Sequence, residues 1–180
     1  MDITKIGSLL AYVASNIPNI NLRKLIKLIF LIDEKSVTER GLSITWLDYY
    51  AWEKGPVAPC IYDIKKQENL FSHYVSSYKN EEGKNIITSN ITREECIWQF
   101  SNREMRLIDS IIHEFGGLNA DELSNFTHRC GGLWDKVVKK HNIDFSVEKK
   151  SSFPIDLKEL IENDDEKLAV YNDAFEIATL

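Results

Sequence analysis

The stretch Leu22-Arg23-Lys24-Leu25-Ile26-Lys27-Leu28-Ile29-Phe30-Leu31-Ile32-Asp33 decides the fold. Its apolar residues cover much of the circumference of a helix, which is typical of a helix that is buried among other elements. Asn21 is a suitable N-cap, and Arg40-Gly41 predicts the end, because glycine readily takes the left-handed conformation that closes a helix. We therefore expect a central helix that runs from Leu22 to near Arg40.

Helical signals also lie on both sides of this stretch. They are an amphipathic stripe from Ile3 to Val13 that stops at residues 16–19, a capping box of Ser101 and Glu104, a helix opened by Asn119 or Asp121, and a run that follows Cys130-Gly131-Gly132. A helical run near residues 157–161 and a last run that ends at Leu180 complete the pattern.

The remaining segments indicate a small β element. Residues 74–78 and 85–88 are β-prone runs separated by a polar stretch with glycine, which predicts a peripheral β-hairpin. Residues 44–57 are aromatic and β-branched, and they fit either a short helix or a strand that enters the turn at Gly55-Pro56. A helix is expected to resume at Pro59. The predicted fold class is mainly α, a compact helical domain with a small β-hairpin or short sheet.

The length and composition fit one compact domain. A chain of 180 residues with 43% hydrophobic content can bury a core without disulfides or a metal. We expect a helical domain over residues 1–150 with a hairpin insertion near residues 74–91, and a C-terminal helical extension over residues 151–180 packed on the same domain. Cys60, Cys96 and Cys130 are widely spaced and form no CxxC pair, which indicates a reducing compartment.

Charge and hydropathy argue against several classes of partner. The formal net charge of −6 argues against a surface that tracks a phosphate backbone, although local basic patches are compatible with it. The turn Gly116-Gly117-Leu118 resembles a helix-turn-helix connection, but Asp121 and Glu122 begin the second helix, where phosphates would bind. The longest apolar stretch, near residues 25–32, is too short to span a bilayer, and the first residues lack the pattern of a secretion signal. We expect a cytoplasmic protein with no membrane insertion and no nucleic-acid partner.

Patterns for catalysis and metal binding are weak. The sequence has no Walker loop and no GxGxxG, HExxH or GxSxG motif. His128 and Cys130, completed by His113 or His141, lack the paired short spacings of a zinc site. We expect no catalytic residue, no metal and no cofactor.

Acidic residues on the predicted helices are interpreted as a solvated face. Asp33 and Glu34 lie beside Lys35 on one helix, and Glu104 and Asp109 lie on another. Catalysis would need buried carboxylates that shift each other's pKa, and burial is not visible in a sequence.

Three segments carry a resemblance to a known family. Residues 22–33 are similar to a helix of the form K-L-x-K-L-L-Y-x-x-D, with Phe30 where tyrosine is frequent. Residues 50–62 are similar to the signature A-W-x-x-G-P-V-x-x-x-x-Y, which is the most specific of the three. Residues 123–134 are similar to a closing T-H-x-x-x-x-W element, with Cys130-Gly131-Gly132-Leu133 in place of a more proline-rich approach. Together the segments resemble the Panacea-domain family of SocA-like antitoxins.

The signature also has a physical interpretation. Pro56 fixes its own φ and keeps Gly55 out of the α region, so the chain turns sharply between the aromatic segment and the next helix. Trp52 and Tyr62 flank that turn. They either pack in the core with the tyrosine hydroxyl at the rim, or form part of a surface that binds a partner. Both interpretations are open at this point.

The resemblance implies an antitoxin that neutralises a cognate, co-encoded toxin by direct contact, within a two-gene operon or a prophage. The candidate partner-binding residues are Trp52, Lys54, Gly55, Pro56, Tyr62, His128 and Trp134. An alternative is an adaptor that delivers a bound partner to a protease, with residues 74–91 and 152–180 as its second surface. Another alternative is a hydrolase-type enzyme that uses His128.

Overall fold

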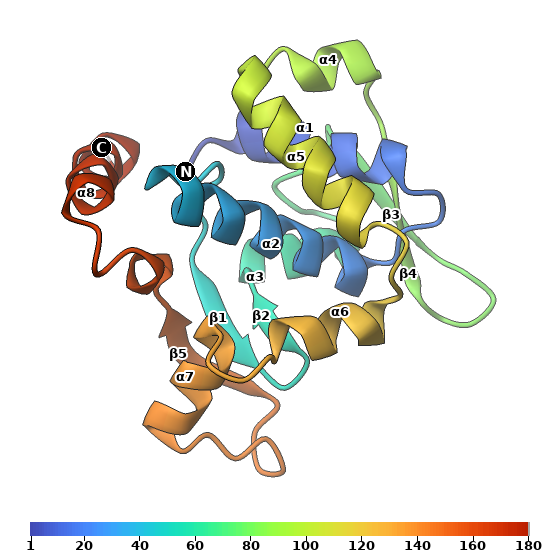
Figure 1. Cartoon of the computed structure of the whole chain (residues 1–180). Helices are drawn as coiled ribbons and strands as arrows, with labels where there is room; N and C mark the ends of the chain where they lie inside the picture. Colours follow the sequence, from blue (N-terminus) through green and yellow to red (C-terminus); the bar gives the residue numbers. More distant parts are fainter. Residues whose placement is uncertain (180) are drawn as a thin grey trace.

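α2 (Leu22–Arg40) is the central element of the computed structural model, which describes residues 1–179 (Figure 1). The side chain of Asn21 accepts a hydrogen bond from Lys24 N at its start, and Gly41 closes it with a φ of 66°. The apolar side chains of α2 are fully buried around much of its circumference, among them Leu25, Leu28, Ile29, Phe30 and Ile32. The predicted central helix is confirmed. Among residues 1–179, no helix is both long and apolar enough to cross a membrane.

Further helices pack around α2. The longer helices that contact α2 directly include α1 (Ile3–Asn16), α5 (Asn102–Phe115) and α6 (Ala120–Thr127). The predicted capping box of Ser101 is present at the start of α5, and α6 starts after Asn119, one of the two predicted openings, where Asn119 and Glu122 form a further capping box. A short helix, α4 (Arg93–Ile97), covers α1 and was not expected, although Thr92 and Glu95 form a capping box that signals it.

A three-stranded antiparallel sheet lies beside α2 in the described part of the chain. Its strand order is β2 (Gly55–Val57), β1 (Tyr49–Trp52) and β5 (Lys150–Ile155). Residues 44–57 therefore contain two strands, β1 and β2, and not a helix. α3 (Pro59–Tyr62) begins at Pro59 as predicted and is followed by a short 3-10 helix (Asp63–Lys65). β5 was not expected, because it holds two serines and Pro154; the proline is tolerated in an edge strand. α7 (Leu133–His141) packs against β5 and β1.

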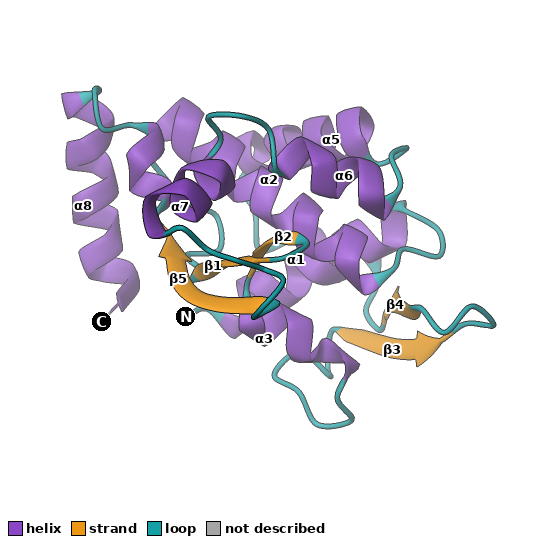
Figure 2. Cartoon of the chain, turned by 90° about the horizontal axis from the view of Figure 1, so that it is seen from below, coloured by secondary structure: helices purple, strands orange, loops and turns teal. Residues whose placement is uncertain are grey.

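The predicted hairpin is present as β3 (Val75–Lys79) and β4 (Asn85–Ser89), which form a second sheet away from the first (Figure 2). Its inner side chains are part of the core, because Val75, Ile86 and Ile87 are buried. Ile87 N also donates a hydrogen bond to the carbonyl of Ile20 at 2.9 Å. The hairpin is therefore anchored on the segment that leads into α2.

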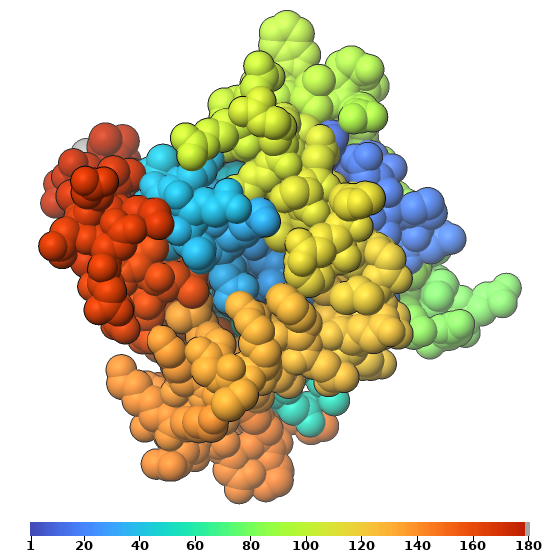
Figure 3. All heavy atoms as spheres, in the orientation of Figure 1, coloured from blue at the N-terminus to red at the C-terminus, as the bar shows by residue number. Residues whose placement is uncertain are grey.

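The C-terminal segment returns to the far end of α2. The helical run predicted near residues 157–161 is a 3-10 helix (Leu157–Leu160), and α8 (Asp165–Thr179) follows. The ring of Trp46 contacts those of Tyr171 and Phe175, with centroid distances of 5.0 and 5.9 Å. Figure 3 shows α8 in red beside α2, part of which is exposed between α8 and α5. Leu180, the last residue of the predicted run, lies outside the described residues.

Candidate functional site

The tip of the β1–β2 hairpin rests on a buried lysine of α2. Lys27 is 1% exposed, and its Nζ donates a hydrogen bond to the carbonyl of Pro56 at 2.8 Å. Gly55 has a φ of 106°, and a Cβ on it would lie 2.8 Å from both Lys27 Nζ and Thr127 Oγ1. The hairpin can therefore approach α2 and α6 this closely only with glycine at this position. Burial, assisted by the charge of Arg23, lowers the pKa of Lys27 to about 7.

Aromatic side chains from β1, α3 and α7 surround the hairpin. Trp52 and Tyr62 form an edge-to-face pair with a centroid distance of 4.9 Å. Trp134 Nε1 donates a hydrogen bond to the carbonyl of Trp52 at 2.9 Å, and its ring stacks on His128 at 3.7 Å. The signature segment and the closing T-H-x-x-x-x-W segment therefore meet at one place, next to Lys27.

His128 ends α6 and contributes a stacked, neutral ring. Its side chain does not cap the helix; within residues 1–179, no group forms a hydrogen bond with its buried Nε2 atom. Burial, together with the charges of Lys27 and Lys54, lowers the pKa of His128 to about 4. The ring is therefore uncharged near neutral pH and packs as an aromatic group against Trp134.

The structure brings the seven predicted partner-binding residues into one region, but their accessibility differs. Gly55 and Pro56 are buried, Trp52, Tyr62, His128 and Trp134 are half-buried, and Lys54 is exposed. The glycine and proline can position a surface but cannot form it. A partner-binding role for the other residues stays a prediction.

A pocket of about 450 Å³ opens beside the hairpin tip, between the start of α2, α3 and the β3–β4 hairpin. Trp52, Lys54 and Tyr62 line it, whereas His128 and Trp134 lie outside its wall. Sequence reasoning missed four lysines that also line it: Lys65, Lys84, Lys149 and Lys150. These lysines come from three separate segments, so no local motif signals them and only the fold places them together.

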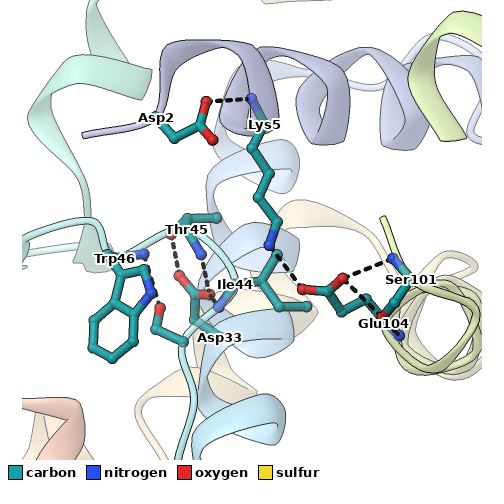
Figure 4. Close-up of polar contacts among 9 residues, drawn as sticks. Asp2, Lys5, Asp33, Ile44, Thr45, Trp46, Ser101 and Glu104 are labelled. Carbon is teal, nitrogen blue, oxygen red and sulfur yellow. Dashed lines mark hydrogen bonds and ion pairs between the residues drawn. The ribbon is translucent and has the colours of Figure 1, made fainter. Parts of the chain in front are cut away.

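Asp33 is fully buried, which corrects its interpretation as part of a solvated face. It is 0% exposed and accepts hydrogen bonds from the backbone N–H groups of Ile44 and Thr45, at 2.8 and 3.0 Å, and from the Thr45 hydroxyl (Figure 4). The hydroxyl of Tyr49 donates a further bond at 2.8 Å. Burial raises the pKa of Asp33, and the hydrogen bonds from Thr45 and Tyr49 oppose that rise. Asp33 therefore holds the segment before β1 on α2, as Lys27 holds the hairpin tip.

The other acidic residues considered from the sequence also have structural partners. Glu34 is 7% exposed and pairs with Arg129 at 2.7 Å. Glu104 accepts a hydrogen bond from Lys5 Nζ at 2.8 Å (Figure 4), and Asp109 accepts one from a tyrosine hydroxyl of α1 at 2.7 Å. Each carboxylate is engaged with a cation or a hydroxyl donor that holds two elements together.

The histidines and cysteines considered as metal ligands lie in different settings. Cys130 is exposed, the ring of His128 stacks on Trp134, and the ring of His141 stacks on Phe153 at 4.0 Å. Across residues 1–179, no three His, Cys, Asp or Glu side chains are grouped as they would be at a metal site.

Comparison with known proteins identifies one family. The sequence model described as "Antitoxin SocA-like, Panacea domain" matches residues 25–135, which is more than half of the chain. The matched range runs from α2 to the start of α7 and contains all seven predicted partner-binding residues. No curated protein and no solved structure matches the chain.

Proposed function

The chain belongs to the antitoxin SocA-like Panacea domain family, and we propose that it is the antitoxin of a type II-like pair that neutralises a cognate toxin by direct protein binding. The observation that carries this proposal is the family match over residues 25–135. We place both proteins of the pair in the cytoplasm and assign no catalytic step to this chain.

We assign toxin binding to the surface around the β1–β2 hairpin. Trp52 and Tyr62 are half-buried at the pocket, and Lys54 is exposed at the hairpin turn. Aromatic side chains that are partly held by their own domain lose little conformational freedom on binding, which is why they are frequent at interface hot spots. The hydrogen bond from Trp134 to the backbone of Trp52 supports this assignment, because it fixes the position of the aromatic pair.

Co-expression with the product of the neighbouring gene tests the proposal. We expect the neighbouring gene to arrest growth when expressed alone, and this chain to restore growth and to co-purify with its product. The amount of toxin should stay constant in the rescued cells. Growth that is restored without a complex would refute direct neutralisation, and restored growth with a falling toxin level would indicate an adaptor that delivers the toxin to a protease.

A matched pair of tyrosine variants tests the surface. Tyr62→Ala should weaken the complex at least about tenfold, as expected for a hot-spot residue. Tyr78→Ala removes a tyrosine that is 48% exposed on β3, and it should leave the affinity nearly unchanged. Both variants are first compared with the wild type by thermal unfolding. Equal affinities for the two folded variants would refute the assignment of this surface.

A further inference from the structure

The pocket beside the hairpin has a charge opposite to that of the whole chain. Its wall contains seven basic residues and one carboxylate, that of Glu53, whereas the chain carries a net charge of −6. Six of them are cations, namely Arg23, Lys54, Lys65, Lys84 and the neighbouring pair Lys149 and Lys150, and the seventh is the buried Lys27, whose pKa is about 7. So strong a local reversal of charge focuses a positive potential at the mouth of the pocket.

The protein neutralises only part of this charge. Arg23 pairs with Asp121 at 2.9 Å, Lys84 with Glu82 at 2.5 Å and Lys149 with Glu53 at 3.7 Å. Within residues 1–179, no carboxylate oxygen lies within 4.0 Å of the ammonium groups of Lys54, Lys65 and Lys150, whereas the buried Lys27 donates its hydrogen bond to the carbonyl of Pro56. The pocket is therefore suited to an anionic group that comes from outside the chain.

The aromatic residues of the pocket do not offer a free stacking surface. Lys65 Nζ lies 3.5 Å from the centre of the Tyr62 ring, and Lys150 Nζ lies 4.5 Å from the same centre and 4.6 Å from that of Trp52. A base that stacked on either ring would have to displace these ammonium groups and lose their cation–π interactions. A nucleotide therefore fits this pocket poorly.

The wall does not depend on one helix N-terminus for its positive charge. The N-terminus of α2 lies in the wall, where the side chain of Asn21 accepts a hydrogen bond from Lys24 N. The cations are instead long side chains spread over α2, the hairpin turn, the 3-10 helix after α3, the β3–β4 hairpin and the start of β5. Such a distribution suits several carboxylates spaced along a peptide better than one compact phosphate.

We propose that this pocket binds an acidic segment of the partner protein, with carboxylates that pair with the lysines of the rim. This inference rests on the proposed function, because it names the chemistry by which the toxin is recognised. The acidic segment supplies the negative charges that the pocket lacks, and long-range attraction speeds the association of the two proteins.

The test uses two double charge reversals in the full chain. Lys54→Glu with Lys65→Glu changes two exposed lysines of the pocket, and Lys136→Glu with Lys140→Glu changes two exposed lysines of α7 as the control. The probes in calorimetric titrations are the purified toxin, a hexaglutamate peptide, ATP and inorganic tripolyphosphate. We expect the pocket variant to bind both the toxin and hexaglutamate at least about tenfold more weakly, with less dependence on salt, and the control to change by less than about twofold.

The outcomes separate this inference from the proposed function. If the toxin is neither bound nor neutralised, the proposed function fails, while hexaglutamate still tests the pocket. If the toxin binds the pocket variant and the control alike, the pocket assignment is overturned and the antitoxin function stands. Tighter binding of ATP or tripolyphosphate than of hexaglutamate, or no binding of hexaglutamate at all, would also overturn the acidic segment as the ligand.

Discussion

Replacing Asp33 with alanine is expected to lower the free energy of unfolding by about 4 kcal/mol, because several buried donors lose their acceptor together. The carboxylate is 0% exposed and accepts two backbone N–H groups, at 2.8 and 3.0 Å, the hydroxyl of Thr45, and that of Tyr49 at 2.8 Å. Each buried donor left without a partner costs about 1–3 kcal/mol, and relief from burying the carboxylate, together with water that enters the space, offsets part of the sum.

Urea unfolding followed by circular dichroism measures this loss. For a chain of this size, about 4 kcal/mol corresponds to a melting temperature lower by about 12 °C. Glu39→Ala is the matched control, since Glu39 lies on the same helix with a side chain 51% exposed and only a 3.5 Å ion pair to Lys35. Its effect should stay below about 0.5 kcal/mol.

Asp33→Asn refines the argument. The amide oxygen can still accept hydrogen bonds on one side of the side chain, but on the other side the amide N–H groups face groups that are themselves donors. The loss in free energy of unfolding should therefore be smaller than for alanine, about 2 kcal/mol. A loss below about 1 kcal/mol for Asp33→Ala, or one equal to that of Glu39→Ala, would show that Asp33 does not anchor the segment before β1.

Three further predictions concern the hairpin site. Gly55→Ala should destabilise the fold by more than about 2 kcal/mol in urea unfolding, because φ is 106° and the new Cβ meets Lys27 and Thr127 at 2.8 Å. Gly83→Ala is the control: φ is 73° and nothing lies within 4 Å of the new Cβ, so the loss of stability should be only about 1 kcal/mol. The pKa of Lys27 is about 7 in the folded chain, so above that pH the unfolded chain binds more protons than the folded chain, and the free energy of unfolding rises towards alkaline pH. Lys27→Met should abolish this rise. The difference in free energy of unfolding between wild type and variant should therefore change by about 2–3 kcal/mol between about pH 6 and about pH 9. The pKa of His128 falls from 6.5 to about 4 on folding, so the free energy of unfolding decreases as pH drops from about 6.5 towards 4. His128→Gln should remove about 1 kcal/mol of this decrease at about pH 5, a value reduced for solvent screening. Parallel pH profiles of stability for the variant and the wild type would contradict this prediction.

Local features of this protein were predictable from the sequence. The start and end of α2, the capping boxes at Ser101 and Asn119, and the β3–β4 hairpin all depend on residues a few positions apart. The sharp turn at Gly55-Pro56 follows from the backbone restrictions of proline and its neighbour. The helix-or-strand choice over residues 44–57 could not be made locally, because pairing with β2 and β5 decides it.

The candidate site was predictable in part. The three segments of the family resemblance identified Trp52, Tyr62 and Trp134, and the structure places Trp52 in contact with both of the others. The sequence alone did not show that Gly55 and Pro56 are buried, nor that four further lysines line the pocket. No sequence motif marks those lysines, because the local sequence around an exposed lysine does not depend on which other segments the fold places beside it.

The sequence by itself determined helices with their own periodicity and caps, such as α2 and α5, and the turn at Gly55-Pro56, because these signals act over a few residues. Only the tertiary structure decided that Lys27 and Asp33 are buried anchors, and that β5 pairs with a strand about 100 residues earlier, where Ser151 donates to the carbonyl of Ala51. Only the tertiary structure also brings the lysines of the pocket together in a chain whose net charge is −6. Burial and local potential are sums over contacts between distant residues, so they exist only once the chain has folded.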